Sequence, residues 1–413
     1  MATRKRGRRR ALVGTIVLGA AASVAGMIWL NAAGAGSAPE PAALATKGTF
    51  KSEQVERLAA ESTHSSIRGS ELKISRGESK GTHEQIGGGE EVIAAITGSL
   101  APVAVESHDG DTIVYSSWHQ ISHPSPGAIG QGLKVGQPVG VPSVRIHDAS
   151  GRDELIERGA YSPTLSLDGR VAFVRGESDT VRQNVDYAGR IMVGRADGTS
   201  FESWTSESAR YFTYAWAGST LIAYKALPES EAADVYAFTG PASSRLLAPE
   251  AFVIAISPDA SRLLVTVGRR MVEVVRVADG AIEASMTLDG TGVAPYDSPT
   301  TPHALMFAGS WYGDRVVANS DIGLVVLNVR DGIKIESVLK TPGSPTGITE
   351  PTLLDDTHLI GWANLGSLPG RGAKEEPAYD NALVECDLAT QSCTVGTPSA
   401  SRIWTRWVTN PSR

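Results

Sequence analysis

Short polar turns followed by runs of apolar residues recur six times along the chain. Within each run, apolar and polar residues tend to alternate, which indicates a β-strand because successive side chains point to opposite faces. The clearest turns are Ser107-His108-Asp109-Gly110, Ser166-Leu167-Asp168-Gly169 and Ser257-Pro258-Asp259-Ala260. The pattern therefore predicts many short strands joined by tight turns.

The repeats divide into four strands each, which we letter A to D from the inside outward. Strand B is expected at residues 112–116, 171–175, 221–225, 263–267, 315–318 and 359–362. Strand C is expected at residues 144–147, 191–194, 234–238, 272–277, 324–329 and 383–387. The turns Asp197-Gly198, Asp279-Gly280 and Asp331-Gly332 supply the positive φ angles of a tight hairpin between strands C and D.

A repeat of roughly 40 to 50 residues with several strands in each copy is typical of a β-propeller. The fold class is therefore all-β, with six blades. A seventh blade stays open if residues 92–96 or 403–408 belong to a further sheet. The sequence favours instead that one of these segments completes the ring by pairing with the blade at the other end of the chain, because closure removes exposed sheet edges.

The amino-terminal region has a different composition. Residues 1–10 hold six basic residues and no acid, which predicts a cytoplasmic tail, and the stretch from Ala11 to Leu30 has no charge and is long enough to span a membrane as a helix. Residues 31–91 are rich in small and polar residues and are expected to form a flexible stalk. The propeller is assigned to residues 92–410.

These features predict a single-pass membrane protein with the propeller outside the cytoplasm. The alternative is a signal peptide that is cleaved, leaving a secreted protein. Without the six basic residues of the tail, 32 basic residues face 45 acidic ones, an excess of 13 negative charges. This excess disfavours nucleic acid as a partner, since phosphates require a basic surface.

Residues 191–198, Ile-Met-Val-Gly-Arg-Ala-Asp-Gly, with the Asp168-Gly169 turn and its strand before them, resemble a repeat of the TolB-type propellers, part of the WD-repeat-like class. That family's pattern is Ser-Pro-Asp-Gly, a basic residue and an apolar strand. Residues 257–259 match it, with Ala260 in place of glycine, whereas Leu167 stands where proline is usual and the third, fifth and sixth blades keep only the strands. The resemblance covers residues 92–410 and implies the fold, because propellers host many activities.

Long connecting segments are expected on one side of the ring only. In a propeller, the B–C and D–A connections emerge on one face and the A–B and C–D turns on the other. The long segments all fall on the B–C and D–A side, at residues 118–143, 176–189, 226–233, 290–303 and 365–380. Loops on a rigid scaffold commonly carry binding residues, so this side is predicted to contact the partner.

Several side chains in these segments are candidates for binding a partner, because aromatic residues beside charges often anchor a protein or sugar. They are Trp118, His119, His123, Asp186, Tyr187, Tyr296, Asp297, Arg371 and Tyr379. The spacing of His119 and His123 matches a helical metal pair, but Pro124 and Pro126 argue against a helix there, so no metal site is assigned. The tryptophans at 204, 216, 311, 362, 404 and 407 are interpreted as packing between blades.

The sequence carries no hydrolase motif such as Gly-x-Ser-x-Gly, and no cofactor is expected. It favours a non-catalytic binding or scaffold module for a protein, peptide or glycan of the cell envelope. The alternative is a propeller enzyme, a hydrolase or lyase, with a divalent metal in the central channel. Asp355, Asp356 and His358 are conceivable ligands there, although the two aspartates are interpreted more simply as an A–B turn.

The chain has two cysteines, Cys386 and Cys393, on either side of a short polar turn. Cysteines that face each other across a hairpin outside the cytoplasm are expected to form a disulfide. The alternative is a pair of buried reduced thiols.

Overall fold

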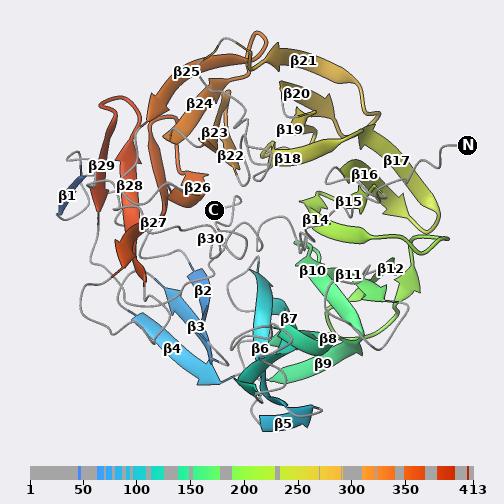
Figure 1. The fold of residues 1–413 in the computed structure, drawn as a ribbon. Coiled ribbons are helices and arrows are strands. Elements are labelled where there is room, and N and C mark those ends of the chain that lie inside the picture. The colour runs from blue at the N-terminus through green and yellow to red at the C-terminus, as the bar shows by residue number, and fades with distance from the viewer. Residues whose placement is uncertain are drawn as a thin grey trace, which may run out of the picture.

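Seven β-sheets stand around a common axis in the computed structural model of the chain (Figure 1). The structure describes residues 45–47, 63–68, 71–76, 80–85, 90–93, 96–107, 113–124, 138–147, 152–176, 188–227, 233–268, 270–289, 291, 309–320, 323–339, 348–367, 379–395 and 407–408. Within these residues no helix is both long and apolar enough to cross a membrane. The predicted span at residues 11–30 lies outside them.

Six of the sheets follow one another along the chain and correspond to the six predicted repeats. Each runs from an inner strand to an outer one, and all neighbouring strands in them pair antiparallel except β1 with β29. The predicted B strands are found as β7, β11, β15, β19, β23 and β27, and the C strands as β8, β12, β16, β20, β24 and β28. The strands of these sheets are β5 (Glu90–Ile93), β6 (Ile96–Ser107), β7 (Ile113–Pro124), β8 (Pro138–His147) and β9 (Asp153–Arg158); β10 (Ala160–Leu165), β11 (Arg170–Gly176), β12 (Gly189–Arg195) and β13 (Glu202–Ser203); β14 (Tyr211–Ala217), β15 (Thr220–Ala226), β16 (Ala233–Gly240) and β17 (Ser243–Ala248); β18 (Ala251–Ile256), β19 (Arg262–Val267), β20 (Met271–Arg276) and β21 (Ile282–Thr287); β22 (Gly309–Tyr312), β23 (Arg315–Ser320), β24 (Gly323–Asn328) and β25 (Lys334–Leu339); and β26 (Ile348–Leu353), β27 (His358–Ser367), β28 (Tyr379–Asp387) and β29 (Ser392–Val395).

The seventh sheet, which we call the closing blade, combines both ends of the described chain. Its order is β30 (Trp407–Val408), β2 (Thr63–Arg68), β3 (Glu71–Arg76) and β4 (Lys80–Gln85), and β30 pairs with β2 through Thr63–Val408 and His64–Trp407. Residues 407–408 thus belong to a further sheet, which is the seventh blade that the sequence left open, rather than pairing into one of the six expected blades. The closing blade lies between the blade of β26 to β29 and the blade of β5 to β9 (Figure 1).

The expected stalk at residues 31–91 differs from the structure, which places β1 (Ala45–Lys47), β2, β3, β4 and β5 in this segment. The composition of these strands is polar, so the sequence alone predicts no sheet there. Their backbone groups are nevertheless paired, β2 with both β3 and β30. Hydrogen bonding to neighbouring strands satisfies a polar segment that has little apolar surface of its own.

β1 adds a further strand to the last of the six consecutive blades. It pairs parallel with β29, Ala45 opposite Cys393 and Lys47 opposite Val395. Cys393 is joined to Cys386 of β28, so the predicted disulfide is confirmed, and both cysteines are buried. The two cysteines also lie directly opposite each other in the β28–β29 register. The disulfide therefore ties together the hairpin on which β1 docks.

In the three blades from β10 to β21, burial falls from the inner strands to the outer strands. All six residues of β10 are buried, as are four consecutive residues in each of β11, β15 and β19. Outer strand β21, in contrast, alternates between exposed and half-buried positions. A consecutive run of buried residues means that both faces of the strand are covered. The apolar core therefore lies between neighbouring blades.

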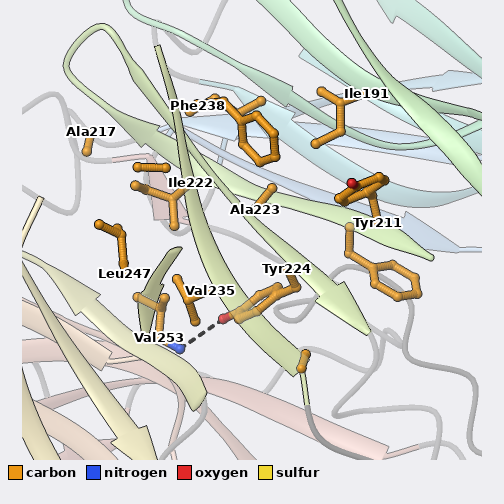
Figure 2. Close-up of a cluster of buried hydrophobic side chains, with 14 of the residues drawn as sticks. Ile191, Tyr211, Ala217, Ile222, Ala223, Tyr224, Val235, Phe238, Leu247 and Val253 are labelled. Carbon is orange, nitrogen blue, oxygen red and sulfur yellow. Dashed lines mark hydrogen bonds between the residues drawn. The ribbon is translucent and has the colours of Figure 1, made fainter. Parts of the chain in front are cut away.

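Figure 2 shows the largest of these cores, which joins the three blades from β10 to β21. Aromatic and aliphatic side chains of one blade pack against those of the next, among them Ile191, Tyr211, Phe238 and Leu247. Tyr224 is buried there, and its hydroxyl accepts a hydrogen bond of 3.0 Å from the backbone N–H of Val253 in the next blade. Burial raises the pKa of Tyr224 well above its usual value. The bond gives the apolar interface a fixed register.

Similar polar contacts link other inner strands. The Ser162 hydroxyl of β10 donates to the carbonyl of Thr213 in β14, 3.2 Å away, and the Thr213 hydroxyl donates back to the carbonyl of Ser162. Ser162 has a φ of 52° and lies in a β-bulge between Tyr161 and Thr164. The bulge also accommodates Pro163, because a proline that cannot donate to the ladder is tolerated where pairing is interrupted.

A basic residue at the start of strand B stacks on a tryptophan of the next blade. The guanidinium of Arg170 lies 4.3 Å from the ring centre of Trp216, and that of Arg262 lies 5.0 Å from Trp311. The pattern is absent between the blade of β14 to β17 and the blade of β18 to β21. The register of the strands places Thr220 where the arginine stands in the other blades, and Ile256 where the tryptophan stands. The basic residue of the repeat pattern therefore has a structural role, as half of a cation–π contact between blades.

We predict that Arg262 and Trp311 are energetically coupled. Replacing Trp311 by Ala should cost about 3–5 kcal/mol, since the ring is only 6 % exposed. A double-mutant cycle with Arg262→Met should give a coupling of about 0.5–1 kcal/mol in urea unfolding. The cycle on Arg170 and Trp216 should give a similar value. A coupling near zero in both cycles would mean that the arginines stabilise the blade interface only through the packing of their aliphatic stems.

A second prediction concerns the residue with positive φ in the A–B turns. Ala260 has a φ of 59°, and Gly169 has a φ of 77° at the same turn position. A residue with a Cβ is strained at positive φ by about 1–2 kcal/mol, and glycine loses about 0.5–1 kcal/mol of chain entropy. Ala260→Gly should therefore stabilise the protein by up to about 1 kcal/mol, and Gly169→Ala should destabilise it by a similar amount. Thermal unfolding of both variants checks the pair, and effects of the same sign would contradict the explanation.

Candidate functional site

The chain path divides the ring into two rims of different character. The A–B and C–D connections define what we call the tight-turn rim, where strands are joined by short turns such as residues 166–169, 218–219 and 313–314. The B–C and D–A connections define the connector rim. Each predicted long segment falls on a B–C or D–A connection, for example between β11 and β12 and between β27 and β28. The predicted segregation of long connectors is confirmed by the element order.

Two B–C hairpins extend further along the strand direction than the rest. β6 and β7 have 12 residues each, and β27 and β28 have 10 and 9, whereas β15 and β19 have 7 and 6. The extra length lies at the connector rim. β7 remains paired with β6 as far as Pro124, and β27 remains paired with β28 as far as Ser367. We call these two features the β7 hairpin and the β27 hairpin.

Both hairpins belong to blades that flank the closing blade, in which only two residues, 69 and 70, separate strand B (β2) from strand C (β3) (Figure 1). On the connector rim, the two long hairpins therefore lie on either side of a blade with a short B–C connection. A rigid ring with two paired, projecting hairpins can present a partner with fixed contact points, since strands hold side chains more precisely than loops do.

Three of the predicted binding residues belong to the β7 hairpin. Trp118, His119 and His123 lie in β7 rather than in a loop, opposite Ala101, Leu100 and Thr97 of β6. The backbone there is extended, so the helical spacing of the two histidines has no counterpart in the structure. Tyr379 begins β28 in the β27 hairpin, opposite Ser367. The remaining candidates, Asp186, Tyr187, Tyr296, Asp297 and Arg371, lie outside the described residues.

On the tight-turn rim, several aspartates are hydrogen-bonded within their own turns. Asp259 accepts hydrogen bonds from the Ser257 hydroxyl at 2.6 Å and from the hydroxyl and backbone N–H of Ser261. The Ser257 bond, followed by the two from Ser261, lowers the pKa of Asp259 to about 2. Asp197 is held in the same way by Thr199, and its pKa is also lowered. These carboxylates stabilise turns and stay ionised.

Asp355 and Asp356 form the A–B turn of the last consecutive blade, as interpreted from the sequence. Asp355 accepts bonds from the backbone N–H groups of Thr357 and His358 at 2.7 and 2.8 Å, and its carboxylate lies 3.0 Å from the His358 ring. Burial opposes ionisation of Asp355, but these hydrogen bonds outweigh it and lower its pKa. Across the described residues, no three His, Cys, Asp or Glu side chains are grouped so as to hold a metal ion.

One carboxyl group, that of Glu273, has a raised pKa instead of a lowered one. Burial raises the pKa of Glu273 in β20 above its usual value. General acids and bases work best with a pKa near the operating pH, so it matters whether this carboxyl group lies near either rim. Glu273 lies in the middle of a C strand, away from both rims. Its position is therefore separate from the hairpins that carry the predicted binding residues.

The comparisons with known proteins concern the fold. No protein-family model matches the sequence, and no curated protein matches it either. Solved structures similar to this chain include TolB from Acinetobacter baumannii, with 12 % identity, 85 % of this chain and 67 % of that chain covered, and a TM-score of 0.39. They also include the dihydro-heme d1 dehydrogenase NirN (15 %, 91 % and 80 %, 0.47) and the C-terminal WD40 domain of Sif2 (11 %, 82 % and 84 %, 0.43).

The fold is a TolB-like, WD-repeat-like β-propeller. This assignment stands on the sheets described above, since the solved structures share too little sequence to inform on more than the fold. β-Propellers as a class host many unrelated activities, so the fold does not imply one function. The function has to be argued from this chain's own surfaces.

The bonds to Asp259 predict a specific acid sensitivity. Its pKa in the folded protein, about 2, is below the value of ~3.9 in an unfolded chain, so its contribution is present above pH ~4 and is lost as the pH falls through 2. Solvent screening keeps the effect below about 1 kcal/mol. Asp259→Asn should lower stability at pH 6 but not at pH 2, measured by urea unfolding at both values. An equal loss at both would show that the charge is irrelevant.

Proposed function

We propose that this protein is a membrane-anchored, extracytoplasmic β-propeller that binds a protein, peptide or glycan of the cell envelope through its connector rim, without catalysis. The observation that carries the proposal is the concentration of long connections on one rim, where two extended hairpins flank the closing blade. A closed ring of blades supplies rigidity, and variable connections supply recognition.

The cysteines support the proposed location. Cys386 and Cys393 form a disulfide in the last consecutive blade, and the described residues include no free cysteine. Disulfides persist mainly in oxidising compartments outside the cytoplasm. The uncharged stretch at residues 11–30, after six basic residues, supports an anchor whose amino end stays in the cytoplasm.

The chemistry of the tight-turn rim supports the choice of the opposite rim. Its aspartates are bonded to their own turns, as Asp197 and Asp259 illustrate, and several are paired with arginines of the same hairpin. Groups already satisfied within a turn gain little from a partner, because a new contact must replace an existing bond.

We predict that shortening the hairpin connections removes partner binding while the ring stays folded. In one variant a short turn replaces residues 125–137, and in a second a short turn replaces residues 368–378; neither change alters the paired strands of the blades. Partners recovered with the full chain from detergent-solubilised membranes, identified by crosslinking and mass spectrometry, should be lost from at least one variant.

The matched control for this prediction is Ser219→Asp, an exposed change in a tight turn. It should leave the recovered partners unchanged. Recovery of the same partners with all three variants would overturn the proposal for the connector rim. Purified protein holding a stoichiometric divalent metal would overturn the non-catalytic assignment in favour of a metal-dependent propeller enzyme.

A further inference from the structure

The direction of β1 fixes the side of the ring from which the amino-terminal segment departs. β29 is a D strand, and D strands run from the tight-turn rim toward the connector rim, because the C–D turn precedes them. β1 pairs with β29 in parallel and therefore runs the same way, with Ala45 at the end nearer the tight-turn rim. The chain before Ala45 leaves the propeller at that rim.

The sequence leaves little chain between this point and the expected membrane span. The segment from residue 31 to residue 44 has 14 residues. A flexible chain of that length has an r.m.s. end-to-end distance of roughly 20 Å, and even fully extended it reaches only about 50 Å. Strand β14, with seven residues, spans about 24 Å between the two rims. The average span of the tether is therefore comparable with the height of the propeller, so the rim from which the tether leaves lies nearer the membrane on average.

Exposed apolar side chains occur at the tight-turn rim. Leu167, at the tip of an A–B turn, is 69 % exposed, and Tyr312, beside another A–B turn, is 41 % exposed. Ile282, directly after the C–D turn at Asp279-Gly280, is 58 % exposed. Tyrosine and large aliphatic side chains are favourable at the boundary between lipid and water. These three positions lie on the rim from which the tether leaves.

Three turns on the same rim carry an aspartate that is paired with an arginine. Arg170 lies 3.0 Å from Asp168, Arg195 lies 3.4 Å from Asp197, and Arg276 lies 3.1 Å from Asp279. Outside its basic tail the chain has an excess of 13 negative charges, which an anionic lipid surface would repel. Pairing these three aspartates with neighbouring arginines reduces that repulsion at this rim.

From these observations we propose that the propeller stands on the membrane with its tight-turn rim facing the lipid and its connector rim facing away. The partner then approaches from the aqueous side opposite the membrane, and it is a soluble or surface-attached macromolecule rather than a neighbour buried in the same bilayer. The inference rests on the proposed function, since it requires an uncleaved anchor at residues 11–30.

Two single-cysteine variants, one on each rim, test this orientation. Ser206 precedes β14 at the connector rim, and Ser219 follows it at the tight-turn rim; both are exposed. Ser206→Cys and Ser219→Cys, each in the full chain, are labelled with the same donor dye, and the native cysteines stay unlabelled because they are joined. The proteins are placed in vesicles of neutral and anionic phospholipids that carry acceptor dyes on their headgroups.

Energy transfer should be higher from position 219 than from position 206, by about twofold or more given the ~24 Å between them. Equal transfer, or higher transfer from position 206, would overturn the orientation even though the protein is anchored. If the protein does not sediment with the vesicles, the anchor is wrong, and the proposed location fails together with this inference. Sedimentation therefore separates the two failures.

A variant of β1 tests the cause of the orientation. Thr46→Pro removes a backbone donor from β1 and should release it, since proline cannot take part in the ladder. The tether then extends to β2 and comprises residues 31–62, and the difference in transfer between the two positions should shrink. Thr46→Val, which keeps the donor, should preserve the difference. An undiminished difference in the Thr46→Pro protein would show that β1 does not set the orientation.

Discussion

The structure depends on the burial of both faces of the central strands. β11, β15 and β19 each have four consecutive buried residues, so each of these sheets needs an apolar neighbour on either side. A row of such sheets leaves two uncovered faces, and only a ring covers them all. Polar and cation–π contacts between blades then fix how neighbouring blades are positioned. The exchange between Ser162 and Thr213, the Tyr224 bond to Val253 and the arginine–tryptophan stacks each fix how one blade sits against the next.

The same architecture separates structural from recognition roles. On one rim, short turns with engaged aspartates hold strand ends together, and the arginine at the start of strand B contributes to the blade interface. On the other rim, strand length and connector length vary from blade to blade, from the three residues between β19 and β20 to the extended β7 and β27 hairpins. Variation is tolerated there because the apolar interface is complete without those residues.

Much of the ring could be predicted from the sequence, because apolar runs after Asp-Gly turns carry a strong local signal. The six B strands and six C strands, the disulfide and the Asp355-Asp356 turn are examples. The closing blade was missed because β2, with the sequence Thr-His-Ser-Ser-Ile-Arg, has no such signal and gains its partners from residues far along the chain. Likewise, the histidines of β7 were placed in a connecting segment because strand B was expected to end at residue 116, whereas β7 continues to Pro124. The stacking of Arg170 and Arg262 was not predicted, although the recurring basic residue after the turn was the available signal.

The pairing of β30 with β2, and of β1 with β29, has a consequence for biogenesis. Residues near both ends of the polypeptide must meet before the first and last sheets are complete, so the ring cannot close until synthesis, and export if the protein is secreted, have delivered the final strand. Until then the half-assembled array has open sheet edges that invite aggregation. Closure of the ring is therefore a late step of folding, whichever blades form first.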